Sequence, residues 1–326
     1  MPGRVFVTGG SGLVGAALLR RLERDGRETV ALARSERSSA VVAGLGARPA
    51  RGDVLDPDGL ADSMRGCDVV FHVAGAIQTC ATDASLMVRT NVEGTRNVVE
   101  AAARAGVRRV VLTSSAATIG EERHAVARED TPHRGWHLTT YERSKHEAER
   151  LAFERGGRLG LEVVAVNPAS VQGPDRVSGA ARLLLTHLRG RLPVLVNVPL
   201  SLVDVEDCAR GHLLAETRGG PGERYLLCGA SLTVREALEI VERTTGVRRR
   251  GWFAPVGAVA ALAGPIEAAF RAVGRPPPFC RELARALVHG RSCDGSRAAR
   301  DLGLAYTPVE ETLRRIVETL RGRGLL

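Results

Sequence analysis

The chain has 326 residues, 44% of them hydrophobic and 25% charged, which is typical of a globular protein with a sizeable buried core. Its longest apolar run, Trp252–Ala263, is too short to span a bilayer, which takes about 20 apolar residues. The N-terminus leads directly into a strand-like run and shows no signal peptide. We therefore expect a cytoplasmic protein with no membrane span.

Charge and cysteine usage exclude further classes of protein. The net charge of +9 is spread along the chain, and the densest basic run, residues 248–250, has no interleaved aromatic residues. We therefore expect no nucleic-acid partner, whereas a surplus of cations suits an anionic cofactor or substrate. The cysteines form no C-x-x-C pair and have no histidine at ligand spacing, so we expect isolated thiols, no disulfide framework and no metal site. They are Cys67, Cys80, Cys208, Cys228, Cys280 and Cys293.

The first predicted elements are a strand over Arg4–Thr8, a turn with glycines at 9, 12 and 15, and a helix over Ala16–Glu23. This order is typical of a dinucleotide-binding unit. Its glycines let the backbone approach a pyrophosphate, and the helix N-terminus faces the phosphate charge. A tight turn without a ligand is the alternative. The predicted cofactor contacts here are Gly9, Gly12, Leu13 and Val14.

A second predicted strand, Thr29–Ala33, ends at Arg34. An acidic residue at this position would bind the ribose 2′-hydroxyl of NAD, whereas arginine binds the 2′-phosphate of NADP. We therefore predict NADP in preference to NAD, with Arg34, Ser35 and Arg37 as contacts. Glu36 is the one residue here that argues for NAD.

The third and fourth predicted strands cover Ala47–Val54 and Asp68–Val73. Asp53 is placed to accept a hydrogen bond from the adenine amino group, and small residues after the fourth strand let the backbone pass close to the adenine ribose. We interpret His72 as a packed structural residue. The contacts predicted in these segments are Asp53, Val54, Val73, Ala74 and Gly75.

A fifth strand over Arg108–Ser115 and a sixth over Leu161–Val166 flank a predicted helix that carries Tyr141 and Lys145. Lys145 is the only lysine of the chain and lies one helical turn after Tyr141. Repeated strand–helix units predict right-handed crossovers and a parallel sheet covered by helices on both faces. Such a sheet binds ligands at the carboxyl ends of its strands.

With these elements in place, the whole sequence resembles an extended short-chain dehydrogenase/reductase, and within that family the dihydroflavonol-reductase-like group. The resemblance rests on Thr8–Gly15, Gly52-Asp53, His72–Gly75, Asn91–Thr95, Thr113–Ser115, Tyr141-x-x-x-Lys145 and Asn167-Pro168. It implies an α/β fold with a Rossmann-type, doubly wound parallel sheet. We expect residues 1–170 to form the NADP-binding domain, with 202–229 returning to its sheet. Residues 171–201 and 230–326 are expected to form a smaller, mixed α/β substrate domain.

The residue types define the chemistry of the predicted site. A tyrosine phenol with a pKa near 10 is a poor acid–base group at neutral pH unless a nearby cation stabilises its phenolate. We therefore predict Tyr141 as the acid–base group and Lys145 as the cation that lowers its pKa. By the resemblance, Lys145 also binds the nicotinamide ribose, Ser115 rather than Ser114 orients the carbonyl oxygen, and Asn91 holds a proton-relaying water. Pro168 and Ser170 complete the predicted cofactor contacts.

The predicted activity is NADPH-dependent reduction of a small, fairly apolar ketone or aldehyde, or the reverse dehydrogenation. A nucleotide-sugar epimerase with tightly bound NAD is the main alternative. Two features argue against an epimerase. Arg34 favours NADP, and the sequence has no arginine just before Val203 that could bind the diphosphate of a nucleotide sugar. A dehydratase would need an acid pair after Thr113–Ser115, and a non-catalytic dinucleotide sensor would have lost the Tyr/Lys pair. The expected partner is a small-molecule substrate, bound by a monomer or homodimer.

Overall fold

The computed structural model describes residues 3–174, 186–248 and 251–326. Its centre is a seven-stranded sheet in which all strands are parallel, in the order β11-β7-β5-β4-β1-β2-β3. The chain winds outward from β1 in both directions, which is the doubly wound arrangement predicted from the sequence. The strands are β1 Val5–Thr8, β2 Thr29–Ala33, β3 Arg48–Arg51, β4 Val69–His72, β5 Arg109–Thr113, β7 Glu162–Pro168 and β11 Arg224–Leu227.

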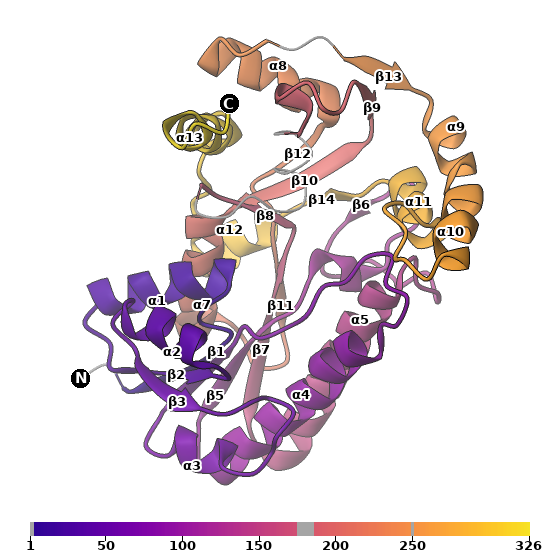
Figure 1. Cartoon of the computed structure of the whole chain (residues 1–326). Helices are drawn as coiled ribbons and strands as arrows, with labels where there is room; N and C mark the ends of the chain where they lie inside the picture. The colour runs from indigo at the N-terminus through magenta and orange to yellow at the C-terminus, as the bar shows by residue number, and fades with distance from the viewer. Residues whose placement is uncertain (1–2, 175–185, 249–250) are drawn as a thin grey trace.

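Helices cover both faces of this sheet (Figure 1). One face carries α1 Leu13–Arg24, α2 Glu36–Ala43 and α7 Val205–Arg218, and the other carries α3 Leu60–Met64, α4 Ser85–Arg104 and α5 Thr140–Leu159. Alternate side chains of each strand supply the two hydrophobic cores, because successive residues of a strand point to opposite faces. In β1, Val5 and Val7 pack with α1 and α7, whereas Phe6 packs with α3 and α4.

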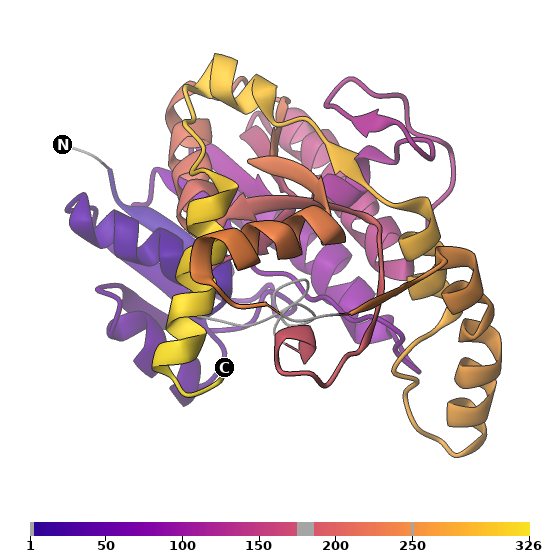
Figure 2. The same cartoon turned by 90° about the horizontal axis from the view of Figure 1, so that it is seen from above.

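The remaining strands form three small sheets. β8 Ser170–Gln172, β10 Pro199–Asp204 and β12 Ala230–Thr233 make one, β9 Val194–Val196 pairs with β13 Trp252–Ala254, and β6 Val126–Ala127 pairs with β14 Ser292–Cys293. β8 begins two residues after β7 ends, so the first of these sheets stands at the carboxyl edge of the central sheet. The helices here are η1 Ala116–Ile119, α8 Val234–Thr245, α9 Val256–Ala261, α10 Ala263–Ala272, α11 Arg281–His289, α12 Ser296–Leu302 and α13 Val309–Gly322. Figure 2 shows α9 to α11 projecting to one side of the molecule.

The predicted boundary between the two domains, near residue 170, remains a prediction. Residues 175–185 of the predicted substrate domain, and positions 249 and 250 of the basic run, lie outside the described residues. Among the helices that the structure does describe, none combines the length and apolar character needed to cross a membrane.

A disulfide joins Cys80, after β4, to Cys280, at the start of α11, with the two Cα atoms 5.5 Å apart. The expectation of isolated thiols is therefore wrong for this pair. The two cysteines are 200 residues apart in the sequence, so their pairing depends on the tertiary fold, which spacing does not reveal. Cys67, Cys208, Cys228 and Cys293 are buried free thiols.

Candidate active site

The glycine-rich loop between β1 and α1 has the geometry of a phosphate site. Gly9 has a φ of +72°, and a Cβ there would lie 2.6 Å from the backbone nitrogen of Ala74. A Cβ on Gly15 would lie 2.2 Å from the Gly9 carbonyl oxygen, so the helix packs directly on the loop. α1 begins at Leu13 with no acidic residue in its first turn and no capping side chain among the described residues. Its first N–H groups, those of Leu13 and Val14 included, therefore suit an anion.

A cavity of about 610 Å³ lies beside this loop at the carboxyl end of β2. Gly12 and Leu13 line it together with Arg34, Ser35 and Arg37, and none of the described lining residues is acidic. The Ser35 hydroxyl caps α2 by accepting a hydrogen bond from the Ser38 N–H at 3.2 Å. Both predicted arginines and the N-terminus of α2 thus adjoin one space next to the predicted pyrophosphate site.

The contacts predicted after β3 and β7 lie at the same edge of the central sheet. The Asp53 carboxylate accepts a hydrogen bond from the Leu55 N–H at 3.0 Å, and the Val54 side chain is buried. Pro168 is the last residue of β7, and Ser170 is exposed at the start of β8. Their roles in binding a cofactor remain predictions.

The segment after β4 leads from the glycine-rich loop to the predicted reaction centre. Val73 follows the end of β4, and the Ala74 N–H donates to the Thr8 hydroxyl at 3.1 Å. A Cβ on Gly75 would lie 3.3 Å from the Asn91 side-chain oxygen and 3.6 Å from Lys145 Nζ. The small residues predicted to adjoin the cofactor therefore also adjoin the predicted catalytic residues.

Ser115 lies close enough to the phenol of Tyr141 to act on its pKa. Burial raises the pKa of the Tyr141 phenol, while Ser115 and the positive charge of Arg291 oppose that rise. The phenol is therefore protonated at neutral pH. The rival serine, Ser114, is buried, and its hydroxyl has no hydrogen-bond partner among the described residues.

Lys145 is buried one helical turn from Tyr141 on α5. Its Nζ donates to the carbonyl oxygen of Thr113, at the end of β5, at 2.7 Å. Burial lowers the pKa of Lys145 to about 8, and Glu149 opposes this shift. The predicted lowering of the Tyr141 pKa by Lys145 remains a prediction, since Ser115 and Arg291 are the groups that lower it in this structure.

Asn91, in α4, is buried and uses both ends of its amide. Its nitrogen donates to the Ala76 carbonyl and the Ser144 hydroxyl, both at 2.9 Å, and its oxygen accepts from the Ala76 N–H at 2.8 Å. Asn91 thus ties the segment after β4 to the helix that carries Tyr141 and Lys145. This geometry is that of a positioning residue, and the predicted water relay remains a prediction.

His72 is the structural residue that the sequence predicts. It is completely buried, and its ring nitrogens lie 2.7 Å from the Thr8 hydroxyl and 3.0 Å from the Thr95 hydroxyl. Burial lowers the pKa of His72 to about 3, so the ring is neutral at physiological pH.

Arg291 is a site residue that the sequence did not reveal. It lies between α11 and β14, yet its charge acts on the phenol of Tyr141. Its Nε donates to the buried carboxylate of Glu121 at 2.8 Å, and its guanidinium lies 3.6 Å from Glu142. Glu142 also pairs with the fully buried side chain of Arg134. Only the fold brings these residues together, because about 150 residues separate Arg291 from Tyr141.

An apolar cavity of about 270 Å³ lies among β9, β10, α8, α9, α11 and α13. Its described lining residues are aliphatic apart from Gln172 and His187, and they include Val194, Leu200, Val259 and Leu287. Gln172 lies on β8, two residues after Ser170.

Comparison with known proteins identifies the family. The model of the NAD dependent epimerase/dehydratase family matches residues 5–228, and the chain belongs to this family. It is 31% identical to a Synechocystis protein provisionally named dihydroflavonol 4-reductase, covering 98% of this chain and 95% of that one. It is 33% identical to sterol demethylase protein B of Methylococcus capsulatus, covering 98% and 99%. It is also 33% identical to the 4-hydroxy-2-methyl-3-oxo-4-farnesyl-3,4-dihydroquinoline-1-oxide ketoreductase of Stigmatella aurantiaca, covering 93% and 92%.

Solved structures agree with this assignment. The crystal structure of gox2253 superimposes with a TM-score of 0.85 at 30% identity and 99% coverage of both chains. MoeE5, solved with UDP-glucose and NAD, gives a TM-score of 0.73 at 26% identity, covering 99% of this chain and 100% of that one. The protein is therefore an NAD(P)-dependent oxidoreductase of the extended short-chain dehydrogenase/reductase type, acting on alcohol or carbonyl groups.

Proposed function

We propose that this enzyme uses NADPH to reduce an apolar ketone or aldehyde, or runs the reverse dehydrogenation. The observation that carries the proposal is the cavity beside Gly12, which Arg34 and Arg37 line without any acidic residue among its described walls. Guanidinium groups and a helix N-terminus favour the extra phosphate that distinguishes NADP from NAD. Glu36, the residue that argues for NAD, does not line this cavity.

The residues around the reaction centre have complementary roles. NADPH supplies the hydride when it is bound. The Tyr141 phenol, protonated at neutral pH, donates its proton to the oxygen on which negative charge develops. Ser115, which acts on the same phenol, orients that oxygen. Lys145, whose Nζ donates to the Thr113 carbonyl and which is positively charged below a pKa of about 8, would hold the nicotinamide ribose of the bound cofactor.

The aliphatic cavity supports an apolar substrate. An extended hydrocarbon group placed among Val194, Leu200 and Leu287 would leave water without losing any hydrogen bond. The names of two relatives point the same way, since one is called a ketoreductase of a farnesylated quinoline oxide and the other a sterol demethylase protein. The carbonyl would stay at Ser115 and Tyr141 while the apolar group occupies the cavity.

A nucleotide-sugar epimerase with tightly bound NAD is the second candidate, because the similarity to MoeE5 includes a complex with UDP-glucose and NAD. An epimerase must hold the diphosphate of its substrate, and Arg291 is a cation whose charge acts on Tyr141. Its Nε is already bonded to the Glu121 carboxylate and its guanidinium lies 3.6 Å from Glu142, so two carboxylates compete with a diphosphate for this arginine. We therefore place reduction ahead of epimerisation.

A substrate screen distinguishes these activities. Purified enzyme would be mixed with NADPH and a panel of apolar ketones, aldehydes and nucleotide sugars, and loss of NADPH absorbance would be followed. We expect turnover of apolar carbonyl compounds with NADPH and loss of that turnover in Tyr141→Phe. Co-purification of NAD, together with interconversion of nucleotide sugars without net change in the cofactor, would overturn the proposal in favour of the epimerase.

A further inference from the structure

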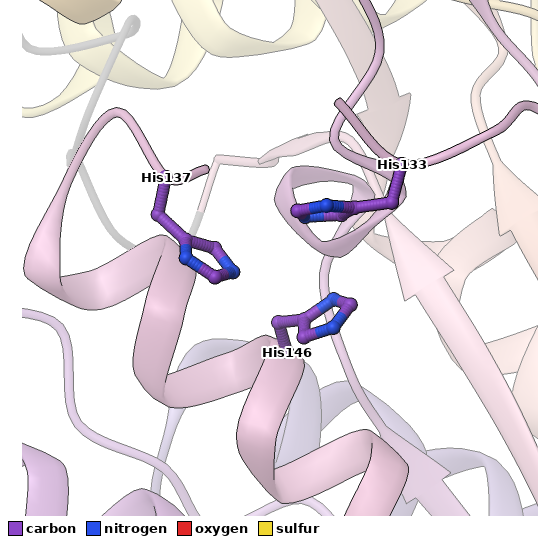
Figure 3. A group of neighbouring side chains, drawn as sticks. All are labelled: His133, His137 and His146. Atoms are coloured by element: carbon purple, nitrogen blue, oxygen red, sulfur yellow. The ribbon is translucent and has the colours of Figure 1, made fainter. Parts of the chain in front are cut away.

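Three histidines meet beside α5 (Figure 3). His133 and His137 lie in the segment that leads into α5, and His146 lies on α5 itself. Their ring centroids are 4.4 to 5.2 Å apart. Each ring offers one nitrogen to the cluster, and these three nitrogens all lie within 4.8 Å of one another. None of the three has a role in the proposed reduction.

Two of these rings bury a nitrogen that has no partner. His133 Nε2 and His137 Nε2 are both inaccessible to solvent and make no hydrogen bond with the described residues. His146 Nδ1 lies 3.2 Å from the carbonyl oxygen of Thr118 and donates to it, which leaves the lone pair of its Nε2 available. A buried nitrogen without a partner is costly. An ion bound between the rings would remove that cost.

A glycine in the backbone next to the cluster leaves space for the ring of His133. Gly120 has a φ of +67°, and a Cβ there would lie 2.1 Å from the ring of His133. Any side chain at this position would therefore displace the ring. His133 Nδ1 accepts a hydrogen bond from the Gly135 N–H at 2.9 Å, which puts the ring proton on Nε2. Coordination through Nε2 moves that proton to Nδ1 and gives up the bond to Gly135.

Three arginines next to the cluster each have a carboxylate partner. Arg134 pairs with Glu142, Arg143 with Glu147, and Arg224 with Glu149. Metal ligation requires each imidazole in its neutral form.

We propose that His133, His137 and His146 form a binding site for a divalent transition-metal ion, with zinc as the best fit. Neutral imidazoles are typical ligands of zinc, at about 2.0–2.1 Å, and three of them leave one position for water. Tetrahedral coordination at that length needs nitrogens roughly 3.3 Å apart, so the rings close inward from their present spacing. The bound ion would tie the segment before α5 to the helix turn that carries Lys145. The sequence predicted no metal here, because only the fold brings His146 to the other two.

Metal titration of the full-length protein, without a polyhistidine tag and stripped with a chelator, tests the site. Zinc would be titrated in competition with a colorimetric chelator, and Co²⁺ would be followed by its visible absorption bands. We expect one Zn²⁺ per chain, Co²⁺ bands of a histidine-ligated site, and no displacement by Mg²⁺, which prefers oxygen ligands. His137→Gln should weaken zinc binding by at least about tenfold.

A matched variant controls for adventitious binding. His124 is exposed and lies outside the cluster, and His124→Asn keeps a residue that tolerates its φ of 68°. We expect this variant to bind zinc like the unchanged protein. His146→Gln provides an independent test if His137→Gln does not fold, as judged by circular dichroism. The absence of saturable binding, binding that both cluster variants retain, or an equal loss in His124→Asn would overturn the proposal.

Discussion

Neutralising the arginines at the end of β2 should change cofactor preference while leaving the fold intact. Arg34 and Arg37 are exposed side chains that line the cavity beside the glycine-rich loop. A hydrogen bond to a charged group contributes about 1.5–3 kcal/mol, and solvent exposure reduces that value. We therefore expect each Arg→Ala substitution to cost about 1–2 kcal/mol of NADPH binding, or roughly 5–30-fold in affinity. If the two losses add, the double variant should lose roughly 30–900-fold.

The assay is a fluorescence titration of each variant with NADPH and with NADH, repeated at two salt concentrations. NADH affinity should change by no more than about threefold, because NADH has no 2′-phosphate. The NADPH loss should shrink at high salt, since exposed charges are screened. Arg24→Ala is the matched control, because Arg24 is exposed at the opposite end of α1. An equal loss of affinity for NADPH and NADH in the arginine variants would refute the prediction that Arg34 and Arg37 bind the 2′-phosphate. A preference of the unchanged protein for NADH would refute it too.

Three further predictions concern pH, the disulfide and the buried ion pairs. The pKa of Lys145 is about 8, so its ammonium is charged below that pH, and kcat/KM for reduction should fall as pH rises through it; a flat profile up to pH 10 would contradict this. In oxidised protein, replacing Cys80 and Cys280 together by serine should lower the free energy of unfolding by about 2–5 kcal/mol, since the bond closes a long loop. Urea unfolding checks this, and a reducing agent should bring the unchanged protein to the same midpoint; an unaltered midpoint in the variant would count against a formed disulfide. Arg134→Met should lower the free energy of unfolding by about 3–5 kcal/mol, because it removes the cation that pairs with the buried Glu142 carboxylate. A second substitution, Glu142→Gln, should recover part of that loss in the same unfolding assay, and no recovery would contradict the assigned pairing.

Local sequence patterns were sufficient to predict the central sheet and its helices. Short apolar runs followed by glycines or small residues define the strands, and the periodicity of the intervening segments defines the helices. Two element boundaries in the structure differ from the predicted ones. α1 begins at Leu13 rather than Ala16, directly after Gly12. β3 ends at Arg51 rather than Val54, since Arg51 is the last residue of β3 that pairs with β2.

The candidate site was predictable only where its residues lie at strand ends or one helical turn apart. Gly9, Arg34, Ser115 and the Tyr141–Lys145 pair satisfy that condition, because a parallel sheet brings its carboxyl ends to one edge. Contacts between distant segments were not predictable. The Cys80–Cys280 bond, the action of Arg291 on Tyr141 and the histidine cluster all depend on how later segments pack against the sheet. Composition and spacing carry no information on that packing.

The fate of the hydride tests the central claim most directly. NADPH deuterated at the transferring position of the nicotinamide would be incubated with the enzyme and the best carbonyl compound of the panel, and the products would be analysed by mass spectrometry. Reduction predicts one deuterium on the carbinol carbon of a released alcohol and one NADP⁺ formed per alcohol. Epimerised nucleotide sugar without net NADPH oxidation, or an undiminished rate in Tyr141→Phe, would contradict an NADPH-dependent reductase that uses Tyr141 as its proton donor.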